Sequence, residues 1–242
     1  ANAYVGKLPF EDVRSQITSM VIGDSVTEIP ASLCAKMSKL SHLTIPTSVT
    51  SIGNSAFLEC STLKSVTLPA SLRTIGDKAF DKCKALSSIT LPDGLESIGT
   101  RAFTECSALT HLQIPSTVHT IGDAAFRKCS ALQNIVLSPA LSRIGEYTFF
   151  DCGALTSIRL PETIQEITGL SLRLCYGTFF GDSLSAMIMQ VDTLDKVIPE
   201  KELNTFYTNV DPTQYYDASR KPIARKAYAA HGASTSDTLY TY

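Results

Sequence analysis

The chain has 242 residues, of which 44% are hydrophobic and 18% are charged, and its formal net charge at pH 7 is −2. The hydrophobic fraction allows a substantial core, and the balanced charge excludes an electrostatic attraction to nucleic acid or to an anionic membrane. No uninterrupted apolar stretch of about 18 residues is present, so we expect no membrane insertion of this chain. No signal peptide is visible in the sequence, which begins with Ala1 rather than Met.

The first element expected is an N-terminal cap over residues 1–16, in which PFEDVRSQ forms a short helix. The segment ITSMVIG at 17–23 then alternates as a strand does, with Ile17 and Ile22 pointing inward. From this strand onward we expect one repeat domain, which covers residues 17–190.

The repeat domain is defined by a step of 23 residues. Cysteine, phenylalanine, isoleucine, glycine and proline all recur with this step. The cysteines of the series are Cys60, Cys83, Cys106, Cys129, Cys152 and Cys175. In the atypical first copy, Met37 takes the cysteine position and Cys34 the phenylalanine position. A self-similar period between about 20 and 50 residues is typical of a solenoid.

Each repeat contains two short extended pieces. LKSVTLP at 63–69 alternates, so Ser65 and Thr67 are expected to point outward. SVTSIG at 48–53 forms the second piece, and Gly53 is expected to permit the turn that follows it.

Between these pieces, SAFLEC at 55–60 is expected to place Phe57 and Cys60 in the core over about one helical or 3₁₀ turn. One repeat of 23 residues cannot bury enough apolar surface to order itself. Stacked copies bury these side chains between them, so the array is the folding unit.

The register of the repeat breaks after Cys175, and LSAMIMQ at 184–190 recovers the strand pattern. We therefore expect eight stacked strands, which span roughly 35–40 Å at about 4.8 Å per step. Residues 191–242 depart from the repeat and are expected to form a C-terminal cap and tail.

The pattern LPxxLxxIGxxAFxxCxxLxxIxL is complete in LPASLRTIGDKAFDKCKALSSITLP at 68–92. It resembles the BspA-like, or Treponema pallidum-type, leucine-rich repeats. The resemblance implies an α/β repeat solenoid, a right-handed leucine-rich-repeat fold with short parallel strands on its concave face. Proteins of this family are typically surface-displayed or secreted proteins of bacteria or protists, implicated in adhesion.

The recurring cysteines are candidates for redox chemistry or for metal binding. Stacked at one phase, neighbouring Cα atoms would lie about 5 Å apart, but parallel Cβ vectors leave the Cβ atoms too far apart for a disulfide. Zinc sites usually use CxxC-like pairs, and the sequence has none. We expect a ladder of buried structural thiols instead.

Other catalytic signals are missing. His42 and His111 fall at outward strand positions three repeats apart, about 14 Å, and no nucleophile motif or phosphate-binding loop is present. We therefore expect solvated histidines, no cofactor, no metal and no enzymatic activity, although a degradative enzyme remains a third hypothesis.

The remaining candidate is a partner-binding surface made by the outward strand positions. These positions are His42, Thr44, Ser65, Thr67, Ser88, Thr90, His111, Gln113, Asn134, Val136, Ser157 and Arg159. Variation toward the C-terminal end favours a locus with Asn134, Arg159 and Tyr215, the last in the tyrosine-rich segment 207–216. A plain solvated sheet, with tyrosines that cap the last repeat, is the alternative.

The leading hypothesis is a non-enzymatic recognition or adhesion module, extracellular or surface-displayed, that binds a protein or glycan through its concave face. The second is a structural spacer in a larger surface protein. The locations in both follow from the family resemblance alone.

Overall fold

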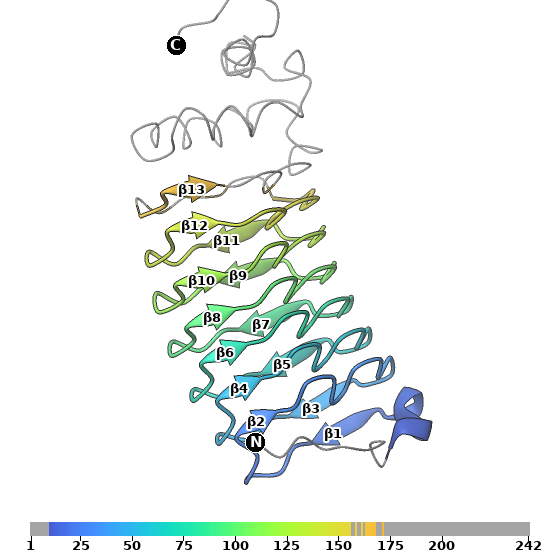
Figure 1. Ribbon diagram of the computed structural model, residues 1–242. Coiled ribbons are helices and arrows are strands. Elements are labelled where there is room, and N and C mark those ends of the chain that lie inside the picture. Colours follow the sequence, from blue (N-terminus) through green and yellow to red (C-terminus); the bar gives the residue numbers. More distant parts are fainter. Residues whose placement is uncertain (1–9, 156–157, 159–160, 162, 168–170, 172–242) are drawn as a thin grey trace, which may run out of the picture.

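The computed structural model describes residues 10–155, 158, 161, 163–167 and 171. They form a solenoid of parallel strands that winds in steps of 23 residues (Figure 1). The expected solenoid is confirmed. Several expectations lie outside the described residues: the N-terminal residues 1–9, Cys175, the strand at 184–190, the segment 191–242, and the binding residues Ser157, Arg159 and Tyr215.

Among the described residues, six coils each contribute one three-residue and one two-residue strand, and the next coil contributes the two-residue strand β13. The three-residue strands are β1 Ser19–Val21, β3 His42–Thr44, β5 Ser65–Thr67, β7 Ser88–Thr90, β9 His111–Gln113 and β11 Asn134–Val136. The two-residue strands are β2 Glu28–Ile29, β4 Ser51–Ile52, β6 Thr74–Ile75, β8 Ser97–Ile98, β10 Thr120–Ile121, β12 Arg143–Ile144 and β13 Glu166–Ile167. The two extended pieces per repeat that the alternation predicts are therefore present.

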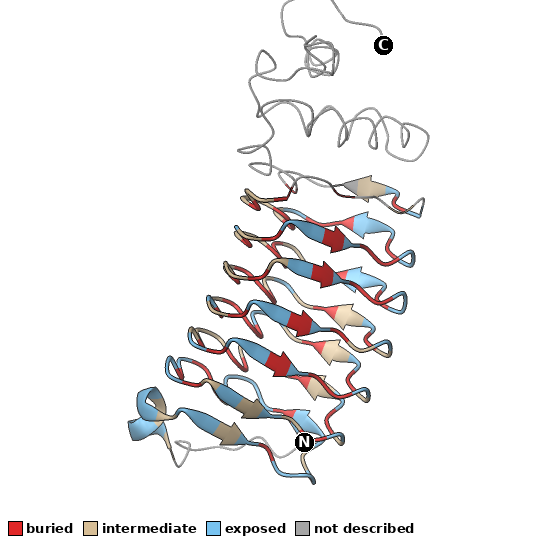
Figure 2. Ribbon diagram, turned by 180° about the vertical axis from the view of Figure 1, so that it is seen from behind, coloured by how far each residue is buried: buried red, intermediate tan, exposed pale blue. Residues whose placement is uncertain are grey.

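The two kinds of strand lie on opposite sides of the core (Figures 1 and 2). The two-residue strands β10, β8, β6, β4 and β2 form one continuous sheet, and β12 pairs with β13. The three-residue strands pair two by two, as β1–β3, β5–β7 and β9–β11. All pairs are parallel, and each residue faces its counterpart 23 positions away, for example Ser65 opposite Ser88. In β5, β7, β9 and β11 the central residue is buried and both neighbours are exposed.

The prediction of a helical or 3₁₀ turn over 55–60 is wrong. This segment, which we call the arc, joins the two strands of a coil through overlapping turns. Ala56, Leu58 and Cys60 donate their amides three residues back within the coil, whereas Ser55, Phe57 and Glu59 donate theirs to carbonyls of the next coil. The left-handed conformation of two residues per coil, such as Ser55 at φ 58° and Glu59 at φ 62°, makes this alternation possible. A helix would direct every amide along its own axis, so the arc instead joins neighbouring coils.

Stacked phenylalanine rings fill the space inside the arc. Phe57, Phe80, Phe103, Phe126 and Phe149 are fully buried. Successive ring centroids lie 5.2, 5.3, 5.6 and 5.7 Å apart, and the planes deviate from parallel by 5–18°. The rings therefore gain aromatic stacking, about 0.5–1.5 kcal/mol per pair beyond their hydrophobic burial. The same column ties each coil to the next.

The turn glycines have a different role from the expected one. None of them adopts the left-handed conformation, so they do not serve to permit the turn. Instead, a Cβ atom on Gly53 would lie 2.7 Å from the backbone nitrogen of Ala31, and one on Gly99 would lie 2.6 Å from that of Asp77. Only glycine allows the preceding coil to approach this closely.

The N-terminal segment contains a 3₁₀ helix, η1, over Glu11–Gln16. From this helix Arg14 donates hydrogen bonds to the carbonyls of Ser32, Leu33 and Ala35 at 3.1, 3.2 and 2.7 Å. In the next coil, the counterparts of Leu33 and Ala35 are Ala56 and Leu58, and their carbonyls accept hydrogen bonds from the amides of the first coil. The guanidinium thus takes the place of a preceding coil. Among the described residues there is no helix long and apolar enough to cross a membrane.

Candidate binding face

The cysteines lie in the core, as the sequence predicts. Cys34, Cys60, Cys83, Cys106, Cys129 and Cys152 are free and buried. From Cys60 onward each Sγ donates to a carbonyl 26 residues earlier, for example Cys106 to Phe80 at 3.2 Å. A small side chain with a weak donor suits this position, because it fills the core and also satisfies a backbone acceptor.

Burial makes the thiols of Cys60 and Cys106 poor nucleophiles. It raises the pKa of Cys60 to about 12, and the nearby Cys34 adds to the rise. The pKa of Cys106, deeper in the solenoid, is raised well above its ordinary value by the same loss of solvation. Since the thiolate is the reactive species, the ladder is a structural element of the core.

The histidines remain apart from one another. His42 is exposed, with Nδ1 within 2.9 Å of the hydroxyl of Ser41, and His111 is exposed on β9. In the part of the chain that the structure describes, no group of three or more His, Cys, Asp or Glu side chains could hold a metal ion.

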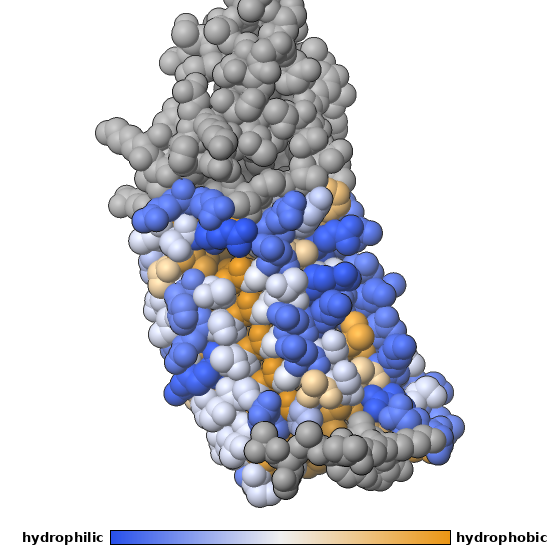
Figure 3. Space-filling model, viewed as in Figure 1, coloured by the Kyte–Doolittle hydropathy of each residue, from blue (hydrophilic) through white to orange (hydrophobic). Residues whose placement is uncertain are grey.

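The outward residues of the three-residue strands form one surface, which we call the ladder face. The predicted residues that the structure describes there are all exposed: His42, Thr44, Ser65, Thr67, Ser88, Thr90, His111, Gln113, Asn134 and Val136. They stand in two columns, because strand register places each residue beside its counterpart in the next coil, as with Gln113 and Val136. The opposite side, which Figure 3 shows, carries a narrow apolar stripe between polar side chains.

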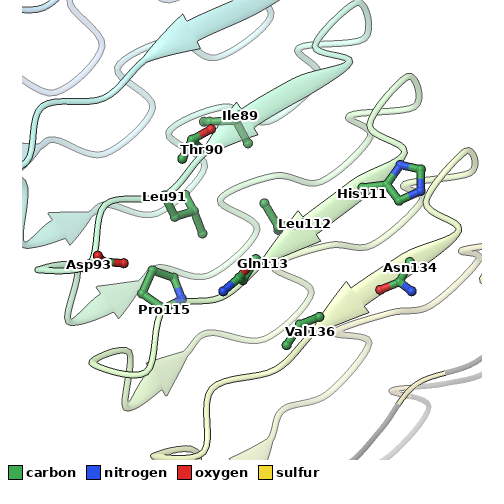
Figure 4. A pocket seen from close by; sticks show the side chains of 10 residues that line it. All are labelled: Ile89, Thr90, Leu91, Asp93, His111, Leu112, Gln113, Pro115, Asn134 and Val136. Atoms are coloured by element: carbon green, nitrogen blue, oxygen red, sulfur yellow. The ribbon is translucent and has the colours of Figure 1, made fainter.

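The ladder face is hollowed at β7, β9 and β11. The hollow has a volume of about 440 Å³ (Figure 4). Five predicted residues line it: Thr90, His111, Gln113, Asn134 and Val136. The other five lining residues, which the outward strand positions do not include, are Ile89, Leu91, Asp93, Leu112 and Pro115.

The missed residues follow from tertiary structure. Asp93 belongs to the loop after β7 rather than to a strand, and the hollow extends beyond the strand ends. No pattern in the sequence singles Asp93 out, because the same position holds Asp24, Thr47, Ala70 and Ser116 in other coils, so an acidic residue there is not unique to this coil. The hollow also coincides with an interruption of strand pairing, since β7 pairs with β5 and β9 pairs with β11.

The hollow combines buried apolar residues with exposed hydrogen-bonding side chains. Leu91 and Leu112 are buried, while Val136 exposes 54% of its surface. Around them stand the hydroxyl of Thr90 and the amide of Gln113. Mixed linings with a few convergent polar groups are characteristic of binding sites.

Asp93 is the one carboxylate among the lining residues. It is exposed, and in the described part of the chain it forms no ion pair. The cation Arg73 lies beside Gly94, the residue after Asp93. The guanidinium of Arg73 donates hydrogen bonds to the carbonyls of Ala70 and Leu72 and lies 4.0 Å from Glu96, so it is already engaged. Among the described residues, the hollow therefore presents a carboxylate that forms no ion pair.

Comparison with known proteins identifies the type of repeat. The model of the BspA type leucine rich repeat region matches residues 3–86 and 50–177, with six copies. No functionally curated protein matches the chain.

Solved structures are similar over most of the repeats. A leucine-rich repeat protein from Bacteroides ovatus is 31% identical, covers 62% of this chain and 45% of its own length, and has a TM-score of 0.57. The Treponema pallidum leucine rich repeat protein is 29% identical, covers 66% of this chain and 77% of its own, and has a TM-score of 0.64. A leucine-rich repeat protein from Eubacterium ventriosum is 25% identical over 65% of this chain and 42% of its own, with a TM-score of 0.58. The chain thus spans less than half the length of the Bacteroides and Eubacterium proteins.

Proposed function

Because the chain belongs to the BspA-type leucine-rich repeat family, we propose that it is a non-enzymatic recognition module that binds a protein or glycan partner through its ladder face. The family favours an interaction or adhesion role, and short parallel strands in solenoids commonly present such surfaces. The observation that carries the proposal is the hollow at β7, β9 and β11, which five independently expected binding residues line.

The chemistry of the described residues points in the same direction. The described thiols are buried, the exposed histidines His42 and His111 lie on separate coils, and the hollow of the ladder face places exposed hydrogen-bonding groups beside apolar surface. Such a surface offers affinity without bond-making chemistry.

We extend the proposal to location: the chain is displayed at a cell surface or secreted. The family resemblance supports this location. Buried thiols with raised pKa values resist oxidation, so the free cysteines are compatible with an oxidising environment.

The test is binding to arrays of purified extracellular-matrix proteins and glycans, with matched variants. Thr90→Arg and Gln113→Arg place bulky charge on the ladder face, whereas Thr120→Arg places it on the exposed part of β10, on the opposite side. A partner held by the ladder face loses about tenfold or more in affinity with the first two variants and keeps it with the third.

The spacer hypothesis makes the contrary prediction. If no immobilised protein or glycan binds the intact chain, or if Thr120→Arg weakens binding as much as Gln113→Arg does, the ladder face is not the recognition surface. Folding of every variant is checked by far-UV circular dichroism.

A further inference from the structure

We propose that the hollow at β7, β9 and β11 holds an extended polypeptide segment of the partner, in which an aliphatic side chain is followed closely by a lysine or arginine. This inference rests on the proposed function and specifies the ligand of the same site. The lining residues, their exposure and the charge of Asp93 carry it.

The amide side chains match the backbone of such a segment. Gln113 and Asn134 are exposed on neighbouring strands, and each offers an NH₂ donor and a carbonyl acceptor. A peptide group presents the complementary pair, one acceptor and one donor. The donor and the acceptor of a side-chain amide are separate atoms, so one such side chain can pair with both groups of an extended backbone.

Val136 provides the place for an aliphatic side chain. It exposes 54% of its surface in a hollow whose other walls include the buried Leu112 and Pro115. Covering an exposed valine with an aliphatic group is favourable by roughly 25 cal/mol per Å² of apolar surface removed from water. The volume of about 440 Å³ suits a few residues rather than a folded domain.

Asp93 determines the charge of the ligand. Its carboxylate is unpaired among the described residues, and the other lining side chains, apart from His111, carry no ionisable group. A neutral glycan would leave this charge without a counterpart. A polypeptide can present a cation next to an aliphatic side chain, so charge complementarity favours it.

The repeat supplies matched controls for these two residues. Asp24 occupies the position of Asp93 three coils earlier and is also exposed. Val21 occupies the column of Val136 five coils earlier and exposes 73% of its surface. Each control removes the same group from the same repeat position, but away from the hollow.

The experiment selects linear peptides from a displayed random library against the full chain and measures their affinity by fluorescence polarisation. We expect selected peptides to share an aliphatic residue one to three positions from a lysine or arginine. Asp93→Asn should weaken binding about three- to tenfold at low salt, with a smaller effect at high salt, because exposed charge pairs are screened. Val136→Ala should also weaken it, while Asp24→Asn and Val21→Ala leave it unchanged.

Three outcomes overturn the inference. They are the selection of no peptide, the selection of peptides without a basic residue, and equal binding by the Asp93→Asn and Asp24→Asn variants. In each case a protein or glycan that still depends on Thr90 and Gln113 would leave the proposed function intact. If neither a peptide nor any protein or glycan binds through the ladder face, the proposed function itself is rejected.

Discussion

The phenylalanine column predicts a position-dependent cost for removing one ring. Phe103 lies between two stacked neighbours, at centroid distances of 5.3 and 5.6 Å, whereas Phe57 has a single ring neighbour, at 5.2 Å, because Cys34 occupies the column before it. Both rings are fully buried, so their hydrophobic burial is the same. Substitution by leucine keeps an apolar side chain but removes the stacking.

The losses in the free energy of unfolding caused by Phe103→Leu and Phe57→Leu should therefore differ by the stacking free energy of one aromatic pair. Stacked pairs contribute about 0.5–1.5 kcal/mol each, so Phe103→Leu should lower the free energy of unfolding by that much more than Phe57→Leu does. The absolute loss for each variant also includes the smaller volume of leucine, about 1 kcal/mol in a packed core.

Urea unfolding followed by far-UV circular dichroism measures both values, since the chain has no tryptophan for fluorescence. Equal losses, or a larger loss for Phe57→Leu, would refute the view that the rings stabilise one another. A changed slope of the unfolding free energy with urea would indicate that the coils unfold separately, in which case the amide exchange of each coil is compared instead.

Three further predictions concern the close approach of coils, the first coil and the thiols. Gly99→Ala would bring a Cβ atom to 2.6 Å from a backbone nitrogen and should cost about 1–3 kcal/mol in urea unfolding, whereas Gly23→Ala, with nothing within 4 Å, should cost less than about 0.5 kcal/mol. Equal effects would reject close approach as the reason for glycine. Arg14→Ala removes three hydrogen bonds to carbonyls and should speed amide exchange in the first coil, with a loss of about 1–3 kcal/mol; unchanged exchange would show that the guanidinium does not cap that coil. Burial raises the pKa of Cys60 from 9.0 to about 12, so between these pH values the folded state keeps a proton that the unfolded state loses. The free energy of unfolding should therefore be full below pH 9 and fall as the pH rises from 9 toward 12. A flat profile of stability against pH in this range would contradict the burial of Cys60.

Much of this architecture is visible in the residues alone. The 23-residue step of Phe57 and Cys60 predicts stacked coils, and the alternation around Val66 predicts which side chains of each strand reach the solvent. These patterns are readable because burial acts on every copy in the same way, so each inward position repeats its residue type. The ten exposed residues of the ladder face follow from the same alternation.

Properties that depend on how two coils meet could not be predicted from the residues of one repeat. The left-handed backbone of Ser55 and Glu59 could not be foreseen, since neither residue type favours it and the hydrogen bonds that compensate lie one coil away. The glycine column looked like a turn signal, although the contact that excludes a side chain there comes from the preceding coil.

By itself, then, the sequence determined the period, the core columns and the exposed positions of the repeats, because these depend on local alternation and on apolar burial. Only the tertiary structure decided where strand pairing is interrupted, that Asp93 joins Gln113 and Val136 around one hollow, and that the arc's amides alternate between coils. Those features depend on how closely neighbouring coils approach each other, and this distance varies with the size of the side chains between them. The residues of a single repeat do not contain that information.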